Sequence, residues 1–231
     1  MNQTLTAIVP FYNEQKTLKE SVERLVGVDF IKEILLVDDC STDSSIEIAN
    51  LLKRKYPNIK LLRNKKNSGK GQAINTAKEH VKTTHVIIHD ADLEYFPEDI
   101  QDLFSEALKS PNSLILGSRF IGTRKRKNIY RRTLIANKAM SLFFSLINLY
   151  KVSDIATCYK LFPNEFFQNI ALKERGFSIE VELLSKFLKY NKRITEVPIG
   201  YEGRSYDEGK KIKTSDGFYY LINTLKYRLL N

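Results

Sequence analysis

Five short apolar runs, each of strand length, recur through the first half of the 231-residue chain. They are TAIVPF (6–11), EILLVDD (33–39), IKLLR (59–63), HVIIHD (85–90) and SLILGS (113–118). Runs that are apolar at nearly every position are typical of parallel strands covered on both faces. Helical patterns such as Leu18, Val22 and Leu25 lie between them. The sequence therefore predicts right-handed β-α-β units in a doubly wound, mostly parallel α/β sheet.

Residues 121–231 are less regular than the first half. Residues 133–150 favour an amphipathic helix with a polar stripe made by Asn137, Ser141, Ser145 and Asn148. The pattern then predicts a helix over 176–190, a strand over 193–201, a polar loop over 203–217 and a last helix over 218–230. Because the apolar stretch is shorter than the about 20 residues that a membrane span needs, we expect no span.

The net charge of +10 predicts attraction to an anionic partner. Nucleic acid, an acidic membrane surface and a phosphorylated small molecule all qualify. Residues 119–132, RFIGTRKRKNIYRR, concentrate seven Lys or Arg without an acid, which is typical of a solvated loop as much as of a binding patch. The helix over 133–150 follows directly, so it either packs on the sheet or lies on a bilayer surface beside the basic run.

The two cysteines, Cys40 and Cys158, stand in no metal-ligand spacing and form no disulfide framework. Such sparse cysteine usage is typical of a reducing compartment. The first residues, MNQTLTAIVPFYNE, lead directly into a strand-like run without the features of an export signal. We therefore expect a folded cytoplasmic protein.

Polar clusters follow four of the predicted strands, at positions 10–14, 38–39, 90–94 and 117–119. Parallel α/β sheets bind ligands outside the carboxyl ends of their strands, so each cluster is a candidate binding element. Asp90 and Asp92 point to the same side of an extended segment, where they can share one hard cation and leave positions for phosphate oxygens. Taken alone, a surface turn before a helix that begins near Pro97 explains the same residues.

Three other segments carry groups suited to a phosphorylated ligand. In VDDCSTDSS, residues 37–45, helix capping explains only the second half and leaves two aspartates to accept hydrogen bonds from a base or ribose. NKKNSGKGQA, residues 64–73, opens a helix whose N-terminus suits an anion, although an ordinary turn explains it as well. The loop over 204–213 carries four Lys or Arg, so it can close over a diphosphate or simply be solvated.

The combination of these motifs, in this order, is more specific than any one of them. P-F-Y-N-E after the first strand, V-D-D after the second, N-S-G-K-G at a helix start, then D-A-D-L-E-Y and G-S-R-F resemble the family 2 glycosyltransferases over nearly the whole chain. The later stretches SDIATCYKLF, GFSIEVELL and EVPIGYEGRSYDEGKKI are most similar to the polyprenyl-phosphate sugar synthases typified by dolichol-phosphate mannose synthase.

The resemblance implies a GT-A fold in a single domain over 1–231. It implies a nucleotide-sugar-binding half over 1–120 and an acceptor-side, membrane-facing half over 121–231 with a mobile loop at 203–213. The residues implied at the base and ribose are Pro10, Tyr12, Glu14, Val37 and Asp39. Asp90, Ala91 and Asp92 match the D-x-D motif, which holds a divalent ion, Mg²⁺ or Mn²⁺, on the donor diphosphate.

The same resemblance implies roles in catalysis. Arg119 of G-S-R-F matches a residue at the donor or acceptor phosphate, and Arg204 with Lys211 matches a mobile cationic loop. The residues implied as catalytic are Asp92, Arg119, Arg204, Lys211 and Glu182. Glu94 stands where the mannose synthases often have Gln, so we expect a third metal ligand or a donor other than GDP-mannose.

The leading hypothesis is an inverting, metal-dependent glycosyltransferase that moves a hexose from a GDP-mannose or UDP-glucose type donor to a polyprenyl or dolichyl phosphate at the cytoplasmic membrane face. Residues 124–150 would make the peripheral membrane contact. The first alternative is transfer to a saccharide or other soluble hydroxyl, for which Glu182 is the nearest general base. A non-catalytic nucleic-acid-binding domain is disfavoured, because the strand-end carboxylates repel phosphates.

Overall fold

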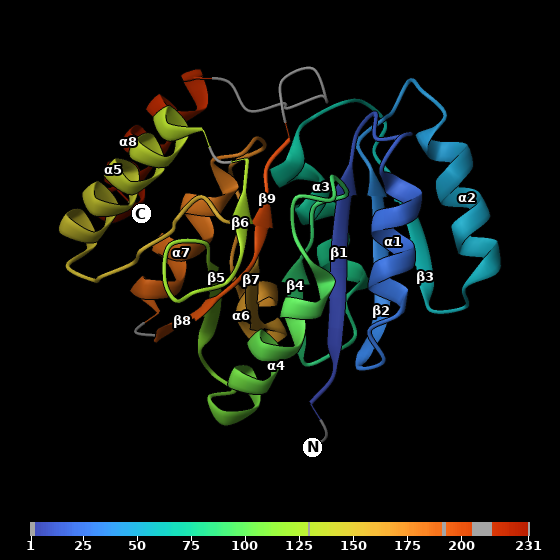
Figure 1. Cartoon of the computed structure of the whole chain (residues 1–231), viewed down its shortest axis with the longest axis horizontal. Helices are drawn as coiled ribbons and strands as arrows, with labels where there is room; N and C mark the ends of the chain where they lie inside the picture. The colour runs from blue at the N-terminus through green and yellow to red at the C-terminus, as the bar shows by residue number, and fades with distance from the viewer. Residues whose placement is uncertain (1–2, 129, 191–192, 205–213, 231) are drawn as a thin grey trace.

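Seven strands form one sheet in the computed structural model, which describes residues 3–128, 130–190, 193–204 and 214–230 (Figure 1). In chain order the strands are β1 (Leu5–Phe11), β2 (Ile31–Asp38), β3 (Ile59–Arg63), β4 (His85–Ile88), β5 (Leu114–Ser118), β7 (Lys160–Pro163) and β8 (Ile194–Pro198). Their spatial order is β3-β2-β1-β4-β7-β5-β8. All neighbours pair in parallel except β7, which is antiparallel to both β4 and β5. The prediction of a mostly parallel α/β sheet is confirmed.

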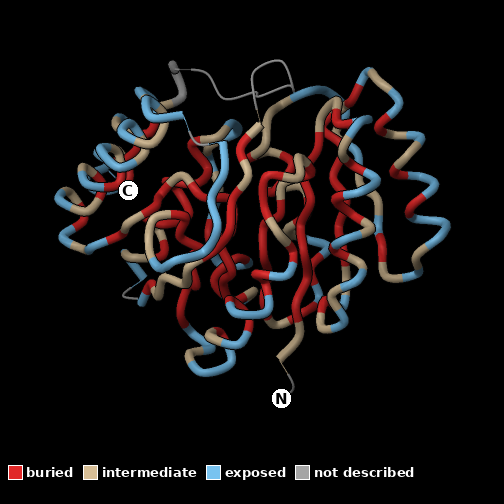
Figure 2. The backbone as a smooth tube through the Cα atoms, in the orientation of Figure 1, coloured by how far each residue is buried: buried red, intermediate tan, exposed pale blue. Residues whose placement is uncertain are grey.

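Helices cover the sheet and fill the connections between its strands (Figure 1). They are α1 (Leu18–Val26), α2 (Ser45–Lys55), α3 (Lys70–Ala77), α4 (Ile100–Lys109), α5 (Arg131–Asn148), α6 (Asn164–Asn169), α7 (Ile179–Lys189) and α8 (Thr214–Leu229). Two short strands, β6 (Arg126–Lys127) and β9 (Tyr201–Glu202), pair separately beside the main sheet. Figure 2 shows the buried residues concentrated along the central strands, and β1 is buried at every position.

The first half of the chain folds as its sequence pattern predicts. Each of the five apolar runs forms a strand, because a strand covered on both faces must be apolar at successive positions. Leu18, Val22 and Leu25 of α1 are fully buried, as their helical spacing requires. The predicted helix over 133–150 is α5, and the last helix begins at Thr214, earlier than the expected residue 218. Most of the expected mobile loop, residues 205–213, lies outside the described residues.

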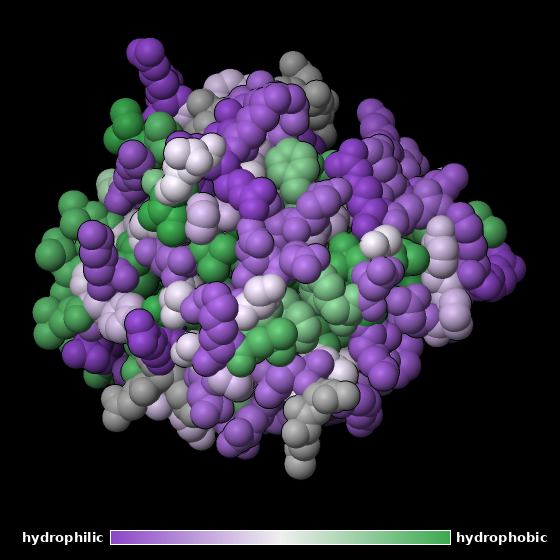
Figure 3. Space-filling model, turned by 60° about the horizontal axis from the view of Figure 1, so that its bottom comes forward, coloured by the Kyte–Doolittle hydropathy of each residue, from purple (hydrophilic) through white to green (hydrophobic). Residues whose placement is uncertain are grey.

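Helices α5 and α8 pack against each other at the end of the molecule opposite α2 (Figure 1). On α5, Ser141 and Phe144 face inward, while Ile135, Leu142 and Leu146 are more than half exposed. Figure 3 shows hydrophobic side chains gathered along this side of the surface. No helix of the described residues is long and apolar enough to cross a membrane.

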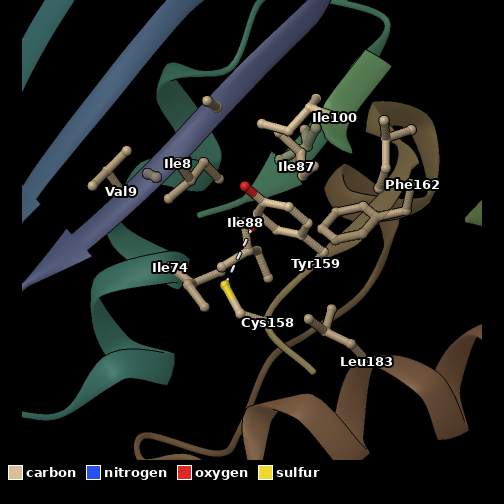
Figure 4. Packing of buried hydrophobic residues seen from close by; sticks show 14 of the residues in the cluster. Ile8, Val9, Ile74, Ile87, Ile88, Ile100, Cys158, Tyr159, Phe162 and Leu183 are labelled. Atoms are coloured by element: carbon tan, nitrogen blue, oxygen red, sulfur yellow. Dashed lines mark hydrogen bonds between the residues drawn. The ribbon is translucent and has the colours of Figure 1, made fainter. Parts of the chain in front are cut away.

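Strand β7 is the strand of the main sheet that the sequence analysis missed. It is only four residues long, begins with a lysine and ends with a proline, so it lacks the signature of a buried strand. It nevertheless lies between β4 and β5 and carries Phe162 into the core beside Ile87 (Figure 4). Just before it, the Cys158 thiol donates a hydrogen bond to the Ile88 carbonyl at 3.4 Å.

Close packing of the loop over 171–176 against the start of α3 gives a test of the fold. A Cβ atom on Gly71 would lie 2.1 Å from the Glu174 carbonyl oxygen, whereas one on Gly176 would meet nothing within 4 Å. We expect Gly71→Ala to lower the free energy of unfolding by about 1–3 kcal/mol through overpacking. Gly176→Ala should raise it by at most about 1 kcal/mol. Urea denaturation measures both, and equal effects would contradict the close approach.

Candidate functional site

A cavity of about 240 Å³ lies at the carboxyl ends of β1, β2 and β4. This is the edge where a doubly wound sheet is expected to bind its ligand. The predicted residues that line it are Pro10, Tyr12, Glu14, Asp39, Asp90, Ala91, Asp92, Glu94, Arg119 and Arg204. Residues far apart in the sequence therefore meet at one site, as the strand-end clusters predicted.

Glu14, just beyond β1, is held by contacts on both sides. Its backbone N–H donates to Ser45 Oγ at 2.8 Å, and its carboxylate accepts a hydrogen bond from Thr17 Oγ1 at 2.9 Å. Arg204 Nη1 donates to the same carboxylate at 3.1 Å. A residue from the end of β1 and one from beyond β9 thus form an ion pair across the cavity.

Asp39, just beyond β2, fixes the loop that precedes α3. Its carboxylate accepts hydrogen bonds from the backbone N–H groups of Ser68 at 3.0 Å and Gly69 at 2.6 Å, and from Asn64 Nδ2 at 2.7 Å. Gly69 has φ 94°, and a Cβ there would lie 2.5 Å from the Arg175 carbonyl oxygen, so only glycine fits. The backbone N–H groups of Ser68 and Gly69, which belong to the segment that the sequence suggested for phosphate binding, therefore donate to Asp39.

Asp90 ends a chain of buried charges that sequence reasoning did not foresee. Lys70 Nζ lies 2.7 Å from Asp90 Oδ1 and 2.8 Å from Glu180 Oε1, and Lys160 Nζ lies 2.5 Å from Glu180 Oε2. The Lys70–Glu180 contact is an ion pair without hydrogen-bond alignment, because Glu180 Oε1 has no hydrogen-bond partner among the described residues. Burial alone would raise the pKa of Asp90, but the charge and hydrogen bond of Lys70 lower it below its usual value.

Asp92 has the opposite electrostatic balance. Burial, followed by the charges of Glu94 and Asp90, raises the pKa of Asp92 to about 8, although Arg204 opposes the shift. Arg204 Nη2 donates to Asp92 Oδ2 at 3.0 Å and also approaches Glu14 and Glu94. Three carboxylates therefore face one guanidinium, and the cluster would gain from more positive charge.

The donor atoms at Asp90 and Asp92 suit a divalent cation such as Mg²⁺ or Mn²⁺, because such ions prefer carboxylate oxygens. The raised pKa of Asp92 supports the fit. Glu94 differs: its Oε2 accepts a hydrogen bond from the Tyr201 hydroxyl at 2.5 Å and its Oε1 one from the Arg204 backbone N–H at 2.9 Å. Within the described part of the chain, no three His, Cys, Asp or Glu side chains form a ready-made metal site.

Arg119, just beyond β5, is locked by a buried partner. Its backbone N–H and Nε donate to Asp154 Oδ2 at 3.0 and 2.8 Å, and its Nη2 donates to Oδ1 at 2.8 Å. Its guanidinium also lies 4.9 Å from the centre of the Tyr201 ring. The bidentate pair fixes the direction in which Arg119 faces the cavity.

Two predicted residues do not line the cavity, and a third lies outside the described part of the chain. Val37 is fully buried within β2, so its side chain packs in the core and does not face a ligand. Glu182 is fully buried in α7, where its carboxylate accepts hydrogen bonds from the backbone N–H groups of Lys173 and Glu174, each at 2.8 Å. Lys211 lies outside the described residues.

Sequence reasoning also passed over several residues of the site. Lys70, Glu180 and Tyr201 line the cavity, and Lys160 and Asp154 pair with site residues from behind. Lys70 stands in the N-S-G-K-G motif, and Asp154 and Glu180 stand in SDIATC and GFSIEVELL. These motifs marked the right segments, but a pairing between residues so far apart in sequence leaves no local pattern.

Comparison with known proteins assigns the chain to a family. The model of Glycosyl transferase family 2 matches residues 6–171. A dolichol-phosphate mannosyltransferase of Pyrococcus furiosus is 32% identical over 98% of this chain and 63% of its own length. A dolichyl-phosphate beta-glucosyltransferase of Trichomonas vaginalis is 27% identical over 91% of this chain and 68% of its own length. The chain thus spans less than two thirds of the archaeal relative.

Solved structures agree on the fold. Glucosyl-3-phosphoglycerate synthase from Mycobacterium tuberculosis, crystallised with Mn²⁺, UDP and phosphoglyceric acid, superposes with a TM-score of 0.73. The match covers 98% of this chain and 78% of that protein at 18% identity. At that identity the likeness establishes the GT-A fold, an α/β architecture with a mixed, mostly parallel sheet.

The raised pKa of Asp92 makes stability depend on pH. Because the folded carboxyl, with a pKa of about 8, binds its proton more tightly than the ordinary value of 3.8, stability falls as pH rises between these values. Asp92→Asn cannot titrate, so the unfolding free energy of this variant minus that of the parent should increase by about 1 kcal/mol or more from about pH 5 to about pH 8. Chemical denaturation in EDTA measures the difference.

The matched control is Asp102→Asn, which alters a half-exposed carboxylate paired with Arg124 on the surface. Its unfolding free energy should differ from that of the parent by the same amount at both pH values. A flat difference for Asp92→Asn as well would contradict the charge excess at the cavity.

Proposed function

The chain belongs to glycosyltransferase family 2, and we propose that it transfers a hexose, with inversion, from a nucleotide sugar to a polyprenyl or dolichyl phosphate at the cytoplasmic face of a membrane. The observation that carries the proposal is the cavity in which Asp90 and Asp92, beyond the end of β4, pair with Lys70 of α3 and with Arg204 beyond β9. A nucleoside diphosphate with its divalent ion is the ligand that such alternating charges accommodate.

In this proposal the first half of the chain, 1–120, holds the donor, of GDP-mannose or UDP-glucose type. Pro10, Tyr12, Glu14 and Asp39 line the side of the cavity formed by β1 and β2, where the base and ribose would bind. Asp90 and Asp92 would hold Mg²⁺ or Mn²⁺, which supplies Lewis-acid neutralisation of the diphosphate when bound. The complex of the mycobacterial structure with Mn²⁺ and UDP supports this assignment.

Arg204 would stabilise the negative charge that grows on the departing diphosphate. It is the cation shared by Glu14 and Asp92, and its Nε is buried without a hydrogen-bond partner among the described residues. A buried donor of this kind is a position that a phosphate oxygen can satisfy. Lys70, which also lines the cavity, adds an ammonium charge near Asp90, and Lys211 remains the proposed further cation.

The acceptor side, within 121–231, fits a phosphate better than a hydroxyl. Arg119 lines both the main cavity and a smaller adjoining pocket that is bordered by Asn128, Thr133 and Asn137. A phosphate acceptor is already an anionic nucleophile and needs no general base, whereas a hydroxyl requires one. Glu182, the candidate base, is buried behind backbone N–H groups and lines neither pocket.

A membrane surface would be met by α5 and α8. Their outward faces carry large apolar side chains: Ile135, Leu142, Leu146, Leu149, Phe218, Tyr219, Ile222, Leu225 and Leu229. Exposed Arg131 and Arg132 begin α5 next to these residues, and cations beside an apolar helical face favour an anionic lipid surface. The names of the two curated relatives, both dolichol-linked transferases, support a lipid acceptor.

Activity is tested with radiolabelled UDP-glucose and GDP-mannose, polyprenyl phosphate and Mn²⁺, with EDTA as the metal-free arm. Arg204→Ala should lower kcat by about 100-fold or more, because it removes a charge that stabilises the leaving group. Arg24→Ala, on the surface of α1 and paired with Glu20, is the matched control and should leave kcat unchanged.

One result of that assay would overturn the proposed acceptor. If no metal-dependent glycolipid forms with either donor, the lipid-phosphate transfer is wrong. Parallel reactions with phosphoglyceric acid and with saccharides test a soluble acceptor, the alternative raised by the ligand of the mycobacterial structure.

Membrane contact is tested separately by vesicle sedimentation with anionic liposomes. The double variant Leu142→Ser with Leu146→Ser should weaken vesicle binding by about tenfold, since each exposed leucine loses apolar area that the bilayer would bury. The double variant Leu51→Ser with Leu108→Ser, exposed on α2 and α4, should bind as the parent does. Equal binding by both double variants would exclude the face formed by α5 and α8.

A further inference from the structure

We propose that Glu94 is a positioning residue, which holds β9 and Arg204 at the rim of the cavity, and that it is not a third ligand of the divalent cation. This inference deepens the proposed function and rests on it for the role of Arg204. The sequence analysis expected either a third metal ligand at Glu94 or a donor other than GDP-mannose, and alternate residues of an extended segment would direct Asp90, Asp92 and Glu94 to one side.

The backbone between Asp92 and Glu94 is not extended. Leu93 has φ 64°, in the left-handed region that leucine rarely adopts. The Glu94 N–H turns back to donate to Asp92 Oδ1 at 3.1 Å. This turn breaks the alternation after Asp92, so strand alternation does not set the direction of the Glu94 side chain.

Glu94 instead binds three residues of the segment that runs through β9. Its Oε2 accepts a hydrogen bond from the Tyr201 hydroxyl at 2.5 Å, its carbonyl oxygen one from the Glu202 N–H at 3.0 Å, and its Oε1 one from the Arg204 N–H at 2.9 Å. Both carboxylate oxygens are thus used by residues of the segment 201–204. The contacts fasten the turn after β4 to β9.

Burial makes these bonds costly to exchange. Glu94 is 8% exposed, so a cation that displaced either donor from its carboxylate would leave the Tyr201 hydroxyl or the Arg204 N–H without this acceptor. A buried polar group without a partner costs about 1–3 kcal/mol. Asp92 also accepts two hydrogen bonds, from the Glu94 N–H and from Arg204 Nη2, but the Arg204 guanidinium pairs with Glu14 as well and would keep that partner beside a cation.

The positions fixed by Glu94 are those on which the proposed charge stabilisation depends. The Tyr201 ring lies 4.9 Å from the Arg119 guanidinium and 5.4 Å from the Tyr95 ring. The Arg204 backbone, held at its N–H, directs the guanidinium to Glu14 and Asp92. One carboxylate therefore holds both the Arg204 backbone and the Tyr201 ring beside the Arg119 guanidinium, whose own direction Asp154 fixes.

The test uses the whole chain with the variants Glu94→Gln, Glu94→Ala and Asp92→Asn. Amide hydrogen exchange by NMR reads the Arg204 N–H, with the Asp39 N–H, which donates to the Phe11 carbonyl, as the internal control. Calorimetric titration with Mn²⁺ alone reads the metal site. Glutamine can still accept from the Arg204 N–H and donate to the Tyr201 oxygen, whereas alanine can do neither.

We expect the Arg204 amide to exchange about tenfold faster in Glu94→Ala and to stay within about threefold of the parent in Glu94→Gln. Mn²⁺ affinity should stay within about threefold of the parent in both Glu94 variants and fall by about tenfold or more in Asp92→Asn.

Two outcomes would overturn the inference. If the Arg204 amide remains protected from exchange in Glu94→Ala, Glu94 does not position Arg204. If Mn²⁺ binds more weakly to both Glu94 variants, the Glu94 carboxylate is a ligand of the cation. If the parent itself binds no Mn²⁺, the metal part of the proposed function fails, and the exchange measurement still decides the role of Glu94.

Discussion

Carboxylates gathered at the ends of β1 and β4 would repel one another, and cations from distant parts of the chain hold them in place. Arg204 reaches Glu14 and Asp92 from beyond β9, while Lys70 reaches Asp90 from the start of α3. The cavity is thus assembled by long-range ion pairs, whose partners are mostly removed from solvent. This arrangement leaves an excess of negative charge around Asp92. A cationic or metal-bound ligand would be attracted by that charge.

The sequence was sufficient for features that depend on local pattern. β1 to β5 follow from runs of apolar residues, and the site follows from the polar clusters at their carboxyl ends, since parallel strands deliver those ends to one edge. β7 was missed because four residues that begin with Lys160 carry no such pattern. Lys160 is fully buried because Glu180, on α7, compensates its charge and the Ile155 and Thr157 carbonyls accept its hydrogen bonds. Pairings of this kind exist only after the chain has folded.

Glu182 and Glu94 show how a residue type at a suggestive spacing can serve a different purpose. Both were expected near the chemistry, and both are buried carboxylates that accept at least one hydrogen bond from a backbone N–H. Glu182 organises the loop that packs on the start of α3, and Glu94 meets β9 because Leu93 turns the backbone. Alternation along a strand predicts side-chain direction only while the strand remains extended, and no feature of D-A-D-L-E-Y announces the left-handed residue.

The insertion of β7 between β4 and β5 has a consequence for the order in which the chain can fold during synthesis. Within the described sheet, β5 pairs only with β7 and β8, which lie about 40 and 80 residues later in the chain. A nascent chain that has emerged only as far as β5 holds that strand without either neighbour. β5 can therefore pair, and Arg119 directly after it can reach its folded position, only after most of the polypeptide has left the ribosome.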